Sequence, residues 1–233
     1  YAVVSFESYN KAVIIDLNTN IVIKEVSGSN GQTIRITPDD EYAYISNVSG
    51  TDKINVIHLD GANSSYVTGI NTGQMGIYWL HYGITSDIRI DPTGNYCAVA
   101  VSFDNKVKII NLSTNTIVQE LSGFNYPLQL AFNSAGTKLA VTNTNGNSVS
   151  IINFNGASST VQGTYSYGTL PLRLGYNPVT DEFFVCNHTD KNVVKIDPAT
   201  GNYTGVLSFT GYPVQVDFDL LGNSIVLLNN IGS

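Results

Sequence analysis

The sequence predicts an all-β repeat fold, and two observations support this prediction. An apolar strand motif recurs along the whole chain, and each copy is followed by a short turn and then by a second β-rich run. When one apolar position of the motif is aligned, consecutive copies are separated by 54, 42, 44 and 42 residues. The aligned residues are Ile36, Ile90, Phe132, Tyr176 and Phe218. A period of about 40–45 residues with several short strands is typical of the blades of a β-propeller.

The fullest repeat, residues 126–166, shows what each blade contains. Four β-rich runs lie at residues 127–132, 138–142, 148–152 and 160–165. Polar turns separate them, and in the first turn Gly136 can adopt the positive φ angle that such a turn requires. The same order of runs fits residues 34–70, 88–122 and 174–209. Each repeat is therefore expected to form a four-stranded antiparallel blade.

The two ends of the chain do not complete a blade. Residues 1–26 supply a second, third and fourth strand without a first, and residues 214–230 supply only a first and a second. Either residues 214–219 complete the first blade and close a five-bladed ring with one spare strand, or the chain is a piece of a propeller of six or seven blades. The pattern favours the second alternative. We expect one domain over residues 1–233, about five blade equivalents, with repeats near 1–33, 34–86, 87–128, 129–172, 173–214 and a partial repeat at 215–233.

Composition and charge exclude several classes of protein. Only 12% of the residues are charged and the net charge is −7, whereas a nucleic-acid-binding protein normally carries a basic face. No apolar run approaches the roughly 18 residues that cross a bilayer. The chain begins at Tyr1 rather than Met, which suggests a mature or trimmed product. The abundance of Asn, Ser, Thr and Tyr favours an extracellular, cell-surface or periplasmic protein.

Neither cysteines nor glycosylation motifs settle the compartment. Cys97 and Cys186 fall in equivalent strands two blades apart, too far for a disulfide, so we expect two buried free thiols. Five Asn-X-Ser/Thr motifs are present, which is close to the number that random placement of these residue types gives. The candidate glycosylation sites are Asn47, Asn63, Asn111, Asn187 and Asn202.

Two segments carry a resemblance to a known repeat family. Residues 140–143 (Ala-Val-Thr-Asn) followed by residues 147–152 (Asn-Ser-Val-Ser-Ile-Ile) closely resemble the YVTN β-propeller repeat. Residues 184–187 with 192–197 look like a second copy, and Ser5 and Ser102 stand where the motif has Asn. The resemblance implies a propeller fold. Similar repeats occur in surface-layer and periplasmic proteins, lactonase-like enzymes and cofactor-bearing redox propellers, so the resemblance leaves the function open.

All three arginines of the chain lie on the first strand of a blade, which is the innermost strand. Counting back from the aligned apolar residue, the positions one and three residues earlier are polar in most repeats. Because both faces of a blade pack against neighbouring blades, we expect these side chains to line the central channel. The predicted channel residues are Arg35, Arg89, Arg173, Asp87, Asp217, Gln129 and Gln215.

Two interpretations of this channel remain open. Guanidinium groups bind carboxylates and phosphates through paired hydrogen bonds, so the arginines could form a site for a small anion. Alternatively the channel residues pair with one another, for example Arg89 with Asp87 or Asp217. Water then fills the rest of the channel, and no ligand binds there. The sequence favours the second interpretation.

A long connection, residues 71–86, causes the one irregular step in the repeat. It contains the chain's only Trp and only Met, and long connections inside compact domains are often functional. Its aromatic residues suit contact with a protein or glycan partner, or self-assembly, although they could also simply cover the blade ends. The candidate partner-binding residues are Tyr78, Trp79, His81 and Tyr82.

Catalytic and cofactor chemistry has little support in this sequence. His188 and His81 are the candidates for a proton-transferring base, but an exposed loop histidine is the expected state of His188. The sequence contains no haem-attachment motif, no nucleophile elbow, no nucleotide loop and no metal-ligand cluster, so no cofactor and no metal is expected. We therefore predict a non-enzymatic extracytoplasmic or cell-surface propeller that acts as a structural or recognition module. The alternative is a lactonase- or lyase-like enzyme that binds an anionic small molecule at the arginines.

Overall fold

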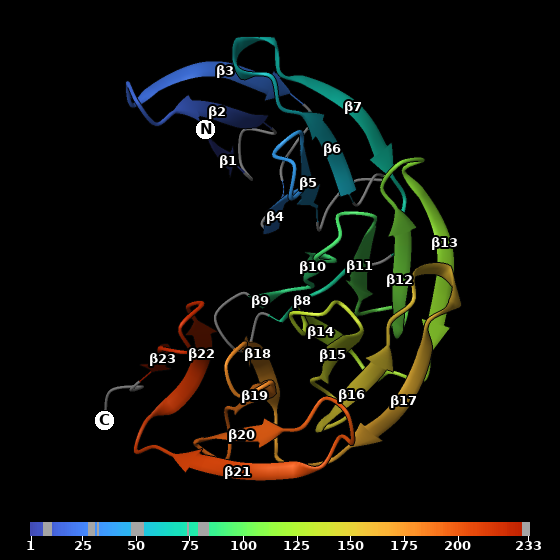
Figure 1. Cartoon of the computed structure of the whole chain (residues 1–233), viewed down its shortest axis with the longest axis vertical. Coiled ribbons are helices and arrows are strands. Elements are labelled where there is room, and N and C mark those ends of the chain that lie inside the picture. The colour runs from blue at the N-terminus through green and yellow to red at the C-terminus, as the bar shows by residue number, and fades with distance from the viewer. Residues whose placement is uncertain are drawn as a thin grey trace.

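The computed structural model describes residues 1–6, 11–27, 31, 33–47, 54–73, 75–78 and 84–229. Within these ranges the chain forms small antiparallel sheets in strict chain order, with each strand paired to its sequence neighbour. Figure 1 shows the sheets side by side around an arc, with the first strand of each full sheet on the inside and the fourth on the outside. The chain is therefore a β-propeller of four-stranded blades, as the sequence predicts.

The blades are numbered by their order along the chain. The first blade has three strands, the second to fifth blades have four each, and a two-stranded partial blade follows. The strands of the first two blades are β1 (Ala2–Phe6), β2 (Lys11–Asp16), β3 (Ile21–Ser27), β4 (Thr33–Ile36), β5 (Tyr42–Ser46), β6 (Ile54–His58) and β7 (Ser65–Ile70). The third blade and the fourth blade contain β10 (Ile88–Ile90), β11 (Tyr96–Val101), β12 (Lys106–Asn111), β13 (Thr116–Ser122), β14 (Pro127–Phe132), β15 (Lys138–Asn143), β16 (Ser148–Asn153) and β17 (Thr160–Tyr165). The remaining blade strands are β18 (Pro171–Asn177), β19 (Glu182–Asn187), β20 (Asn192–Ile196), β21 (Tyr203–Ser208), β22 (Tyr212–Phe218) and β23 (Ser224–Asn229).

The strand predictions for the fullest repeat are confirmed to within one residue at every boundary. A feature that the prediction did not include is a β-bulge between the third and fourth strands of all five such pairs. In the third blade the bulge falls between Ile109 and Ile110, and in the fourth between Ile151 and Ile152. A bulge increases the local twist of a strand pair. The register shift falls at a pair of apolar residues of the third strand in four blades and at Lys195 and Ile196 in the fifth blade, and it bends the outer part of each blade.

Neighbouring blades pack through apolar side chains and through their first turns. One core cluster joins the third and fourth blades and includes Ile109, Leu130 and Leu139, all fully buried. At the turns, Gly136 has a φ of 67° and lies so close to Pro92 of the preceding blade that an added Cβ would be 3.0 Å from its Cδ. Glycine is required there both by the positive φ and by the close approach.

The two ends of the arc are open in Figure 1. β22 pairs with β23 and, among the described residues, not with β1, so residues 214–219 do not complete the first blade. Large apolar side chains are exposed at both ends, including Tyr1 at 65%, Leu220 at 90% and Ile225 at 68%. Membership of a larger ring of six or seven blades stays a prediction. No helix among the described residues is long and apolar enough to span a membrane.

Both thiols are free and buried, as predicted. Burial raises the pKa of Cys97 and of Cys186 to about 12. The position of Ser102 corrects the sequence alignment: in the hairpin registers Val101 pairs with Lys106 where Asn143 pairs with Ser148. Val101 therefore occupies the Asn position of the motif and Ser102 is equivalent to Thr144. In the first blade the same register puts Phe6, not Ser5, at that position, because Phe6 pairs with Lys11.

Candidate functional site

The innermost strands bring most of the predicted channel residues together around one cavity. It has a volume of about 280 Å³ and lies among β4, β10, β14, β18 and β22. Its lining residues are Arg35, Arg89, Gln129, Arg173, Leu174, Gln215, Val216 and Asp217. Because the first strand of each blade runs closest to the axis, alternate side chains of these strands point into this space. We call it the axial cavity.

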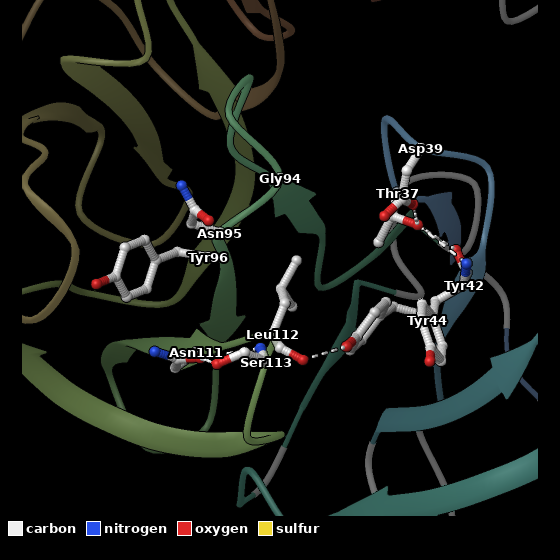
Figure 2. A pocket seen from close by; sticks show the side chains of 10 residues that line it. All are labelled: Thr37, Asp39, Tyr42, Tyr44, Gly94, Asn95, Tyr96, Asn111, Leu112 and Ser113. Carbon is white, nitrogen blue, oxygen red and sulfur yellow. Dashed lines mark hydrogen bonds between the residues drawn. The ribbon is translucent and has the colours of Figure 1, made fainter.

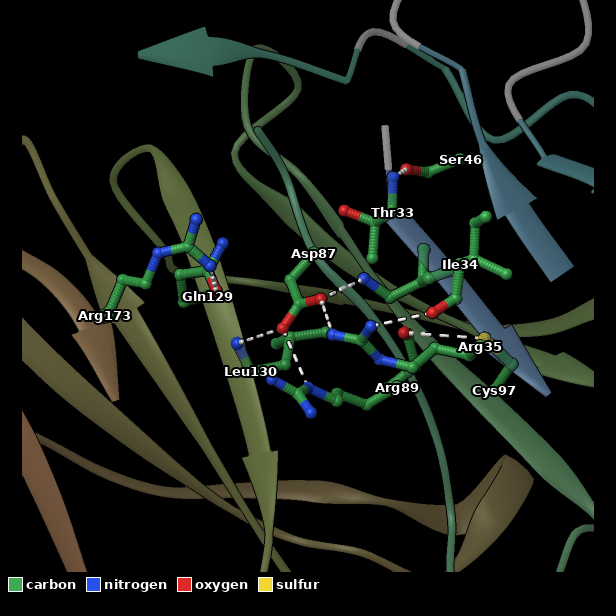
Figure 3. Close-up of polar contacts among 12 residues, drawn as sticks. Thr33, Ile34, Arg35, Ser46, Asp87, Arg89, Cys97, Gln129, Leu130 and Arg173 are labelled. Carbon is green, nitrogen blue, oxygen red and sulfur yellow. Dashed lines mark hydrogen bonds and ion pairs between the residues drawn. The ribbon is translucent and has the colours of Figure 1, made fainter. Parts of the chain in front are cut away.

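Asp87 is the centre of the charge network beside the axial cavity, as Figure 3 shows. Its Oδ1 accepts a hydrogen bond of 2.7 Å from Arg35 Nη2, and its Oδ2 accepts one of 2.9 Å from Arg89 Nε. The carboxylate also accepts from the backbone N–H groups of Ile88 and, at 3.4 Å, Leu130. Only 2% of the Asp87 side chain is exposed. One buried carboxylate therefore holds arginines from two blades and a strand from a third.

Arg173 is placed differently from the other two arginines. Its Nη1 donates a hydrogen bond of 3.2 Å to the neutral amide oxygen of Gln129, and it forms no ion pair among the described residues. Figure 3 shows its guanidinium beside Gln129, on the opposite side of Asp87 from Arg35. Across the cavity, Gln215 donates to the carboxylate of Asp217, which is exposed. The fifth blade thus contributes a cation whose charge is not matched by a contacting carboxylate.

The charges around the cavity leave a positive excess. The three arginines face two carboxylates, those of Asp87 and Asp217, and Asp87 is shared by two of the arginines. Burial lowers the pKa of Arg35 and of Arg173, while the nearby carboxylate of Asp87 raises both pKa values. An arginine remains charged in proteins even under these conditions. Arg35 Nε is also buried without a hydrogen-bond partner among the described residues. The Arg35 Nε donor is not accessible, so the cavity offers a ligand the guanidinium of Arg173, which has one hydrogen bond among the described residues, and a net charge of about +1.

Two residues of the cavity wall, Leu174 and Val216, are not among the channel residues that the sequence predicts. They belong to the apolar row that was expected to pack between blades, and both are indeed buried, at 5% and 2% exposure. They nevertheless also border the cavity. The only sequence clue is their position next to Arg173 and Asp217. Of the two predicted partners of Arg89, Asp87 and Asp217, the structure shows the ion pair with Asp87. The ion pair of Arg35 with the same carboxylate was not predicted.

His188 is not the exposed loop residue that the sequence led us to expect. It is 4% exposed, and its ring stacks on Tyr212 with 4.8 Å between ring centroids. It follows β19 at the position that Thr144 holds after β15, and Thr144 donates a hydrogen bond to the carbonyl of Pro171 in the next blade. The expectation of exposure failed because this column of the repeat bridges consecutive blades. His188 is also absent from the lining of the axial cavity.

The long connection forms a small hairpin of its own, β8 (Ile77–Tyr78) paired with β9 (Ile84–Thr85). Figure 1 shows the hairpin on the inner side of the arc, and β9 contacts β14. Met75 is 2% exposed and packs in the core between the second and third blades. Tyr78 is the last residue of β8, whereas Trp79, His81 and Tyr82 lie outside the described residues. Their role in partner binding and the role of His81 as a base therefore stay predictions.

The five glycosylation motifs differ in burial. Asn63 and Asn202 are exposed and Asn111 is half-buried. Asn47 and Asn187 are 3% and 2% exposed. A folded chain can therefore present at most the first three to a glycan. Among the described residues no group of three or more His, Cys, Asp or Glu side chains is arranged to hold a metal ion.

Comparison with known proteins supports the fold and does not extend to function. No family model matches the chain, and no curated protein matches it by sequence. Among solved structures, it is similar to hydrazine synthase of Kuenenia stuttgartiensis, with a TM-score of 0.69 and 16% identity over 99% of this chain and 80% of that chain. It is also similar to a putative 6-phosphogluconolactonase of Bacteroides fragilis, with a TM-score of 0.71 and 16% identity over 97% of this chain and 72% of that chain. Likeness at this level of identity establishes a shared fold only.

Proposed function

We propose that this protein is an extracytoplasmic or cell-surface β-propeller that acts as a recognition module and binds a small anion in its axial cavity. The observation that carries the proposal is the excess of guanidinium groups: two arginines share one buried carboxylate, and the third, Arg173, forms its one hydrogen bond among the described residues with a neutral amide. The resemblance to the YVTN repeat and the low proportion of charged residues support the cell-surface setting.

The cavity suits a small carboxylate or phosphate. Arg173 and Arg89 can donate paired hydrogen bonds to such a group, and Gln129 and Gln215 add neutral amide groups around it. Leu174 and Val216 border the cavity but are themselves buried, so the groups that a ligand would meet are polar. An anion there would balance the excess positive charge without displacing Asp87, whose hydrogen bonds hold the blades in register.

Thermal unfolding in the presence of anions tests this proposal. Gluconate, succinate and phosphate would be titrated separately against the wild-type chain and against Arg173→Gln. Binding at about 100 times Kd stabilises a protein by about 2.7 kcal/mol. For a chain of this size that corresponds to a rise in Tm of about 5–10 °C. We expect at least one anion to produce such a saturable rise in the wild type and no rise in Arg173→Gln.

The control is Lys24→Gln, which removes the same charge from β3, outside the cavity lining. It should retain the rise in Tm. Arg173 forms no ion pair among the described residues, so Arg173→Gln should fold. The proposal is wrong if no anion raises the Tm of the wild type, or if the two variants respond alike.

The enzyme alternative has one specific observation in its favour. Asp217 and Arg89 line both the axial cavity and an adjoining cavity of about 290 Å³ that also reaches Phe132 and Tyr176. Asp217 could accept a proton from a water molecule that attacks a lactone carbonyl and return that proton to the ring oxygen as the ring C–O bond breaks, which gives the hydroxy acid. Arg89 would then stabilise the developing oxyanion. Hydrolysis of δ-gluconolactone above the spontaneous rate, lost in Asp217→Asn, would support the enzyme over the binding module.

A further inference from the structure

A second cavity lies away from the axis, between the second and third blades. It has a volume of about 330 Å³, within the range of about 300–1,000 Å³ of small-molecule sites. The second blade contributes its first turn and β5, and the third blade contributes its first turn and the turn after β12, as Figure 2 shows. Its lining includes Asp39, Tyr42, Tyr44, Asn95, Asn111 and Leu112. We call this the inter-blade cavity.

The next blade junction explains why the cavity exists. Between the third and fourth blades, Phe132 and Phe154 meet edge to face at 4.7 Å, and Tyr96 contacts Phe154 at 6.3 Å. The equivalent positions at the inter-blade cavity hold the smaller Ile90 and Leu112, which end β10 and follow β12. Where the fourth blade has the short helix η3 (Gly156–Ser158) before β17, the third blade has a turn that is two residues shorter. The space that rings and helix fill at one junction is therefore open at the other.

The aromatic wall of the cavity is held in place by packing and hydrogen bonds. Tyr44 is 1% exposed, and its hydroxyl donates to Asn115 Oδ1 at 2.6 Å. Tyr42 is half-buried, and its ring leans against His58 with 5.3 Å between centroids. Figure 2 shows both tyrosines on the second-blade side, facing Leu112 and Asn111 across the cavity. The ring of Tyr44 is almost wholly covered, so Tyr42 supplies the aromatic surface that a ligand would meet, and its contact with His58 holds that surface in place.

Polar groups on both sides of the cavity have unused hydrogen-bonding capacity. Asp39 Oδ1 accepts from Thr37 Oγ1 at 2.5 Å and from the Glu41 N–H at 3.1 Å, which leaves Oδ2 unbonded among the described residues. Hydrogen bonding from Thr37 lowers the pKa of Asp39, so its carboxylate is charged at neutral pH. Asn111 accepts through Oδ1 from its own turn, and its amide NH₂ is unbonded there. Conversely, Asn95 donates through Nδ2 to Thr93 and keeps its carbonyl oxygen available.

These groups suit a neutral ligand that is rich in hydroxyl groups. Among the residues that the structure describes, Asp39 is the one charged side chain that lines the cavity, so an anion would meet repulsion there and no cation. A sugar ring has an apolar face that can lie on a tyrosine, and adjacent hydroxyl groups that can donate to a carboxylate and accept from an amide. We propose that the inter-blade cavity is a binding site for a neutral monosaccharide unit. This site shares no residue with the axial cavity, so the two proposals stand or fall separately.

The test measures transfer of proton magnetisation from the protein to free sugars by saturation-transfer NMR. The probes are the methyl glycosides of glucose, galactose, mannose and N-acetylglucosamine, each titrated to obtain Kd. We expect at least one to bind the wild-type chain in a saturable way. Leu112→Phe introduces the ring that closes the neighbouring junction and should abolish binding. Thermal unfolding of this variant shows whether it still folds.

A gentler pair of variants keeps the test decisive if Leu112→Phe does not fold. Asp39→Asn keeps the Oδ1 acceptor of the turn and removes the charge, which should weaken sugar binding about tenfold. Asp16→Asn is the matched control, because Asp16 accepts from the Asn18 N–H in a turn of the first blade, away from the cavity. The proposal is overturned if no glycoside binds, if Asp39→Asn and Asp16→Asn bind alike, or if tetramethylammonium competes for the site more strongly than any sugar.

Discussion

The fourth blade and the partial blade at the C-terminal end use similar strands with opposite results. In β15 every residue after the first is buried, whereas in β23 no residue is. Both strands contain Leu and Val, and each pairs with the first strand of its blade. They differ in their neighbours: β15 lies between two complete blades, and β23 lies at the end of the arc. In this fold, burial is therefore a property of the stack of blades more than of the strand itself.

The largest expected difference in the free energy of unfolding is between variants of two carboxylates. Asp87 is buried and bonded to two arginines, whereas Asp217 is exposed on β22 and bonded to an amide. Asp87→Ala leaves two guanidinium groups without their shared partner, so it should lower the free energy of unfolding by about 3–5 kcal/mol. Asp217→Ala should change it by less than about 0.5 kcal/mol. Urea denaturation measures both values. Equal losses would mean that the central network contributes no more than a surface contact.

A second comparison applies one chemical change to both regions. Leu139 on β15 is fully buried, and Leu227 on β23 is 50% exposed. Leu139→Ala removes packed methyl groups and leaves a cavity between two blades, which should cost about 3 kcal/mol. Leu227→Ala should cost less than about 1 kcal/mol, because its side chain already meets water. If Leu227→Ala proved as costly as Leu139→Ala in urea denaturation, β23 would be covered in solution.

The smallest expected effect on stability concerns two glutamates at equivalent places in the first and third blades. Glu25 meets Lys11 at 2.7 Å, whereas Glu120 meets both Lys106 at 2.5 Å and Lys108 at 2.7 Å. Hydrogen bonds from the two lysines lower the pKa of Glu120 from 4.5 to about 2. A lowered carboxyl pKa stabilises the folded state above pH 4.5, and this contribution is lost as the pH falls toward 2.

Glu120→Gln should therefore lower the free energy of unfolding at pH 7 by less than about 1 kcal/mol, since the Glu120 carboxylate is exposed and solvent screens its ion pairs. The difference from wild type should vanish near pH 2. Glu25→Gln should have a smaller effect at pH 7, because Glu25 forms an ion pair with a single lysine. Chemical denaturation across this pH range measures both variants. A Glu120→Gln difference that does not change with pH would contradict the assignment.

The fold could be predicted largely from the sequence, because a propeller repeats one local pattern. Strand boundaries follow from apolar runs and polar turns, which are properties of neighbouring residues. How the arc ends could not be predicted: residues 214–219 have the pattern of a first strand whether they pair with β1 or with β23. Only the spatial arrangement decides that choice. Ser102 was misaligned for a related reason, since hairpin register depends on pairing across the turn.

The candidate site was predictable in part. The alternation of polar residues on the innermost strands predicted which side chains meet at the axis, and the structure brings them together. Arg35 and Arg89 both bind Asp87 because of the distances between blades, and an alignment of the repeats does not contain those distances. The inter-blade cavity is open because Leu112 stands where the next blade has Phe154. The sequence alone does not reveal this, because the contact of Phe154 with Phe132 is visible only in the structure. Burial of His188 likewise depends on Tyr212 in the next blade.

The network around Asp87 also has a mechanical consequence. Arg35, Arg89 and Arg173 come from the second, third and fifth blades, so the spacing of the three guanidinium groups is set by the angles between those blades. The affinity of any ligand that binds all three guanidinium groups would therefore depend on that spacing. By thermodynamic reciprocity, the same ligand would resist any change in it. An axial anion would then stabilise the arrangement of the blades, and the force or temperature needed to separate them would rise with the concentration of the anion.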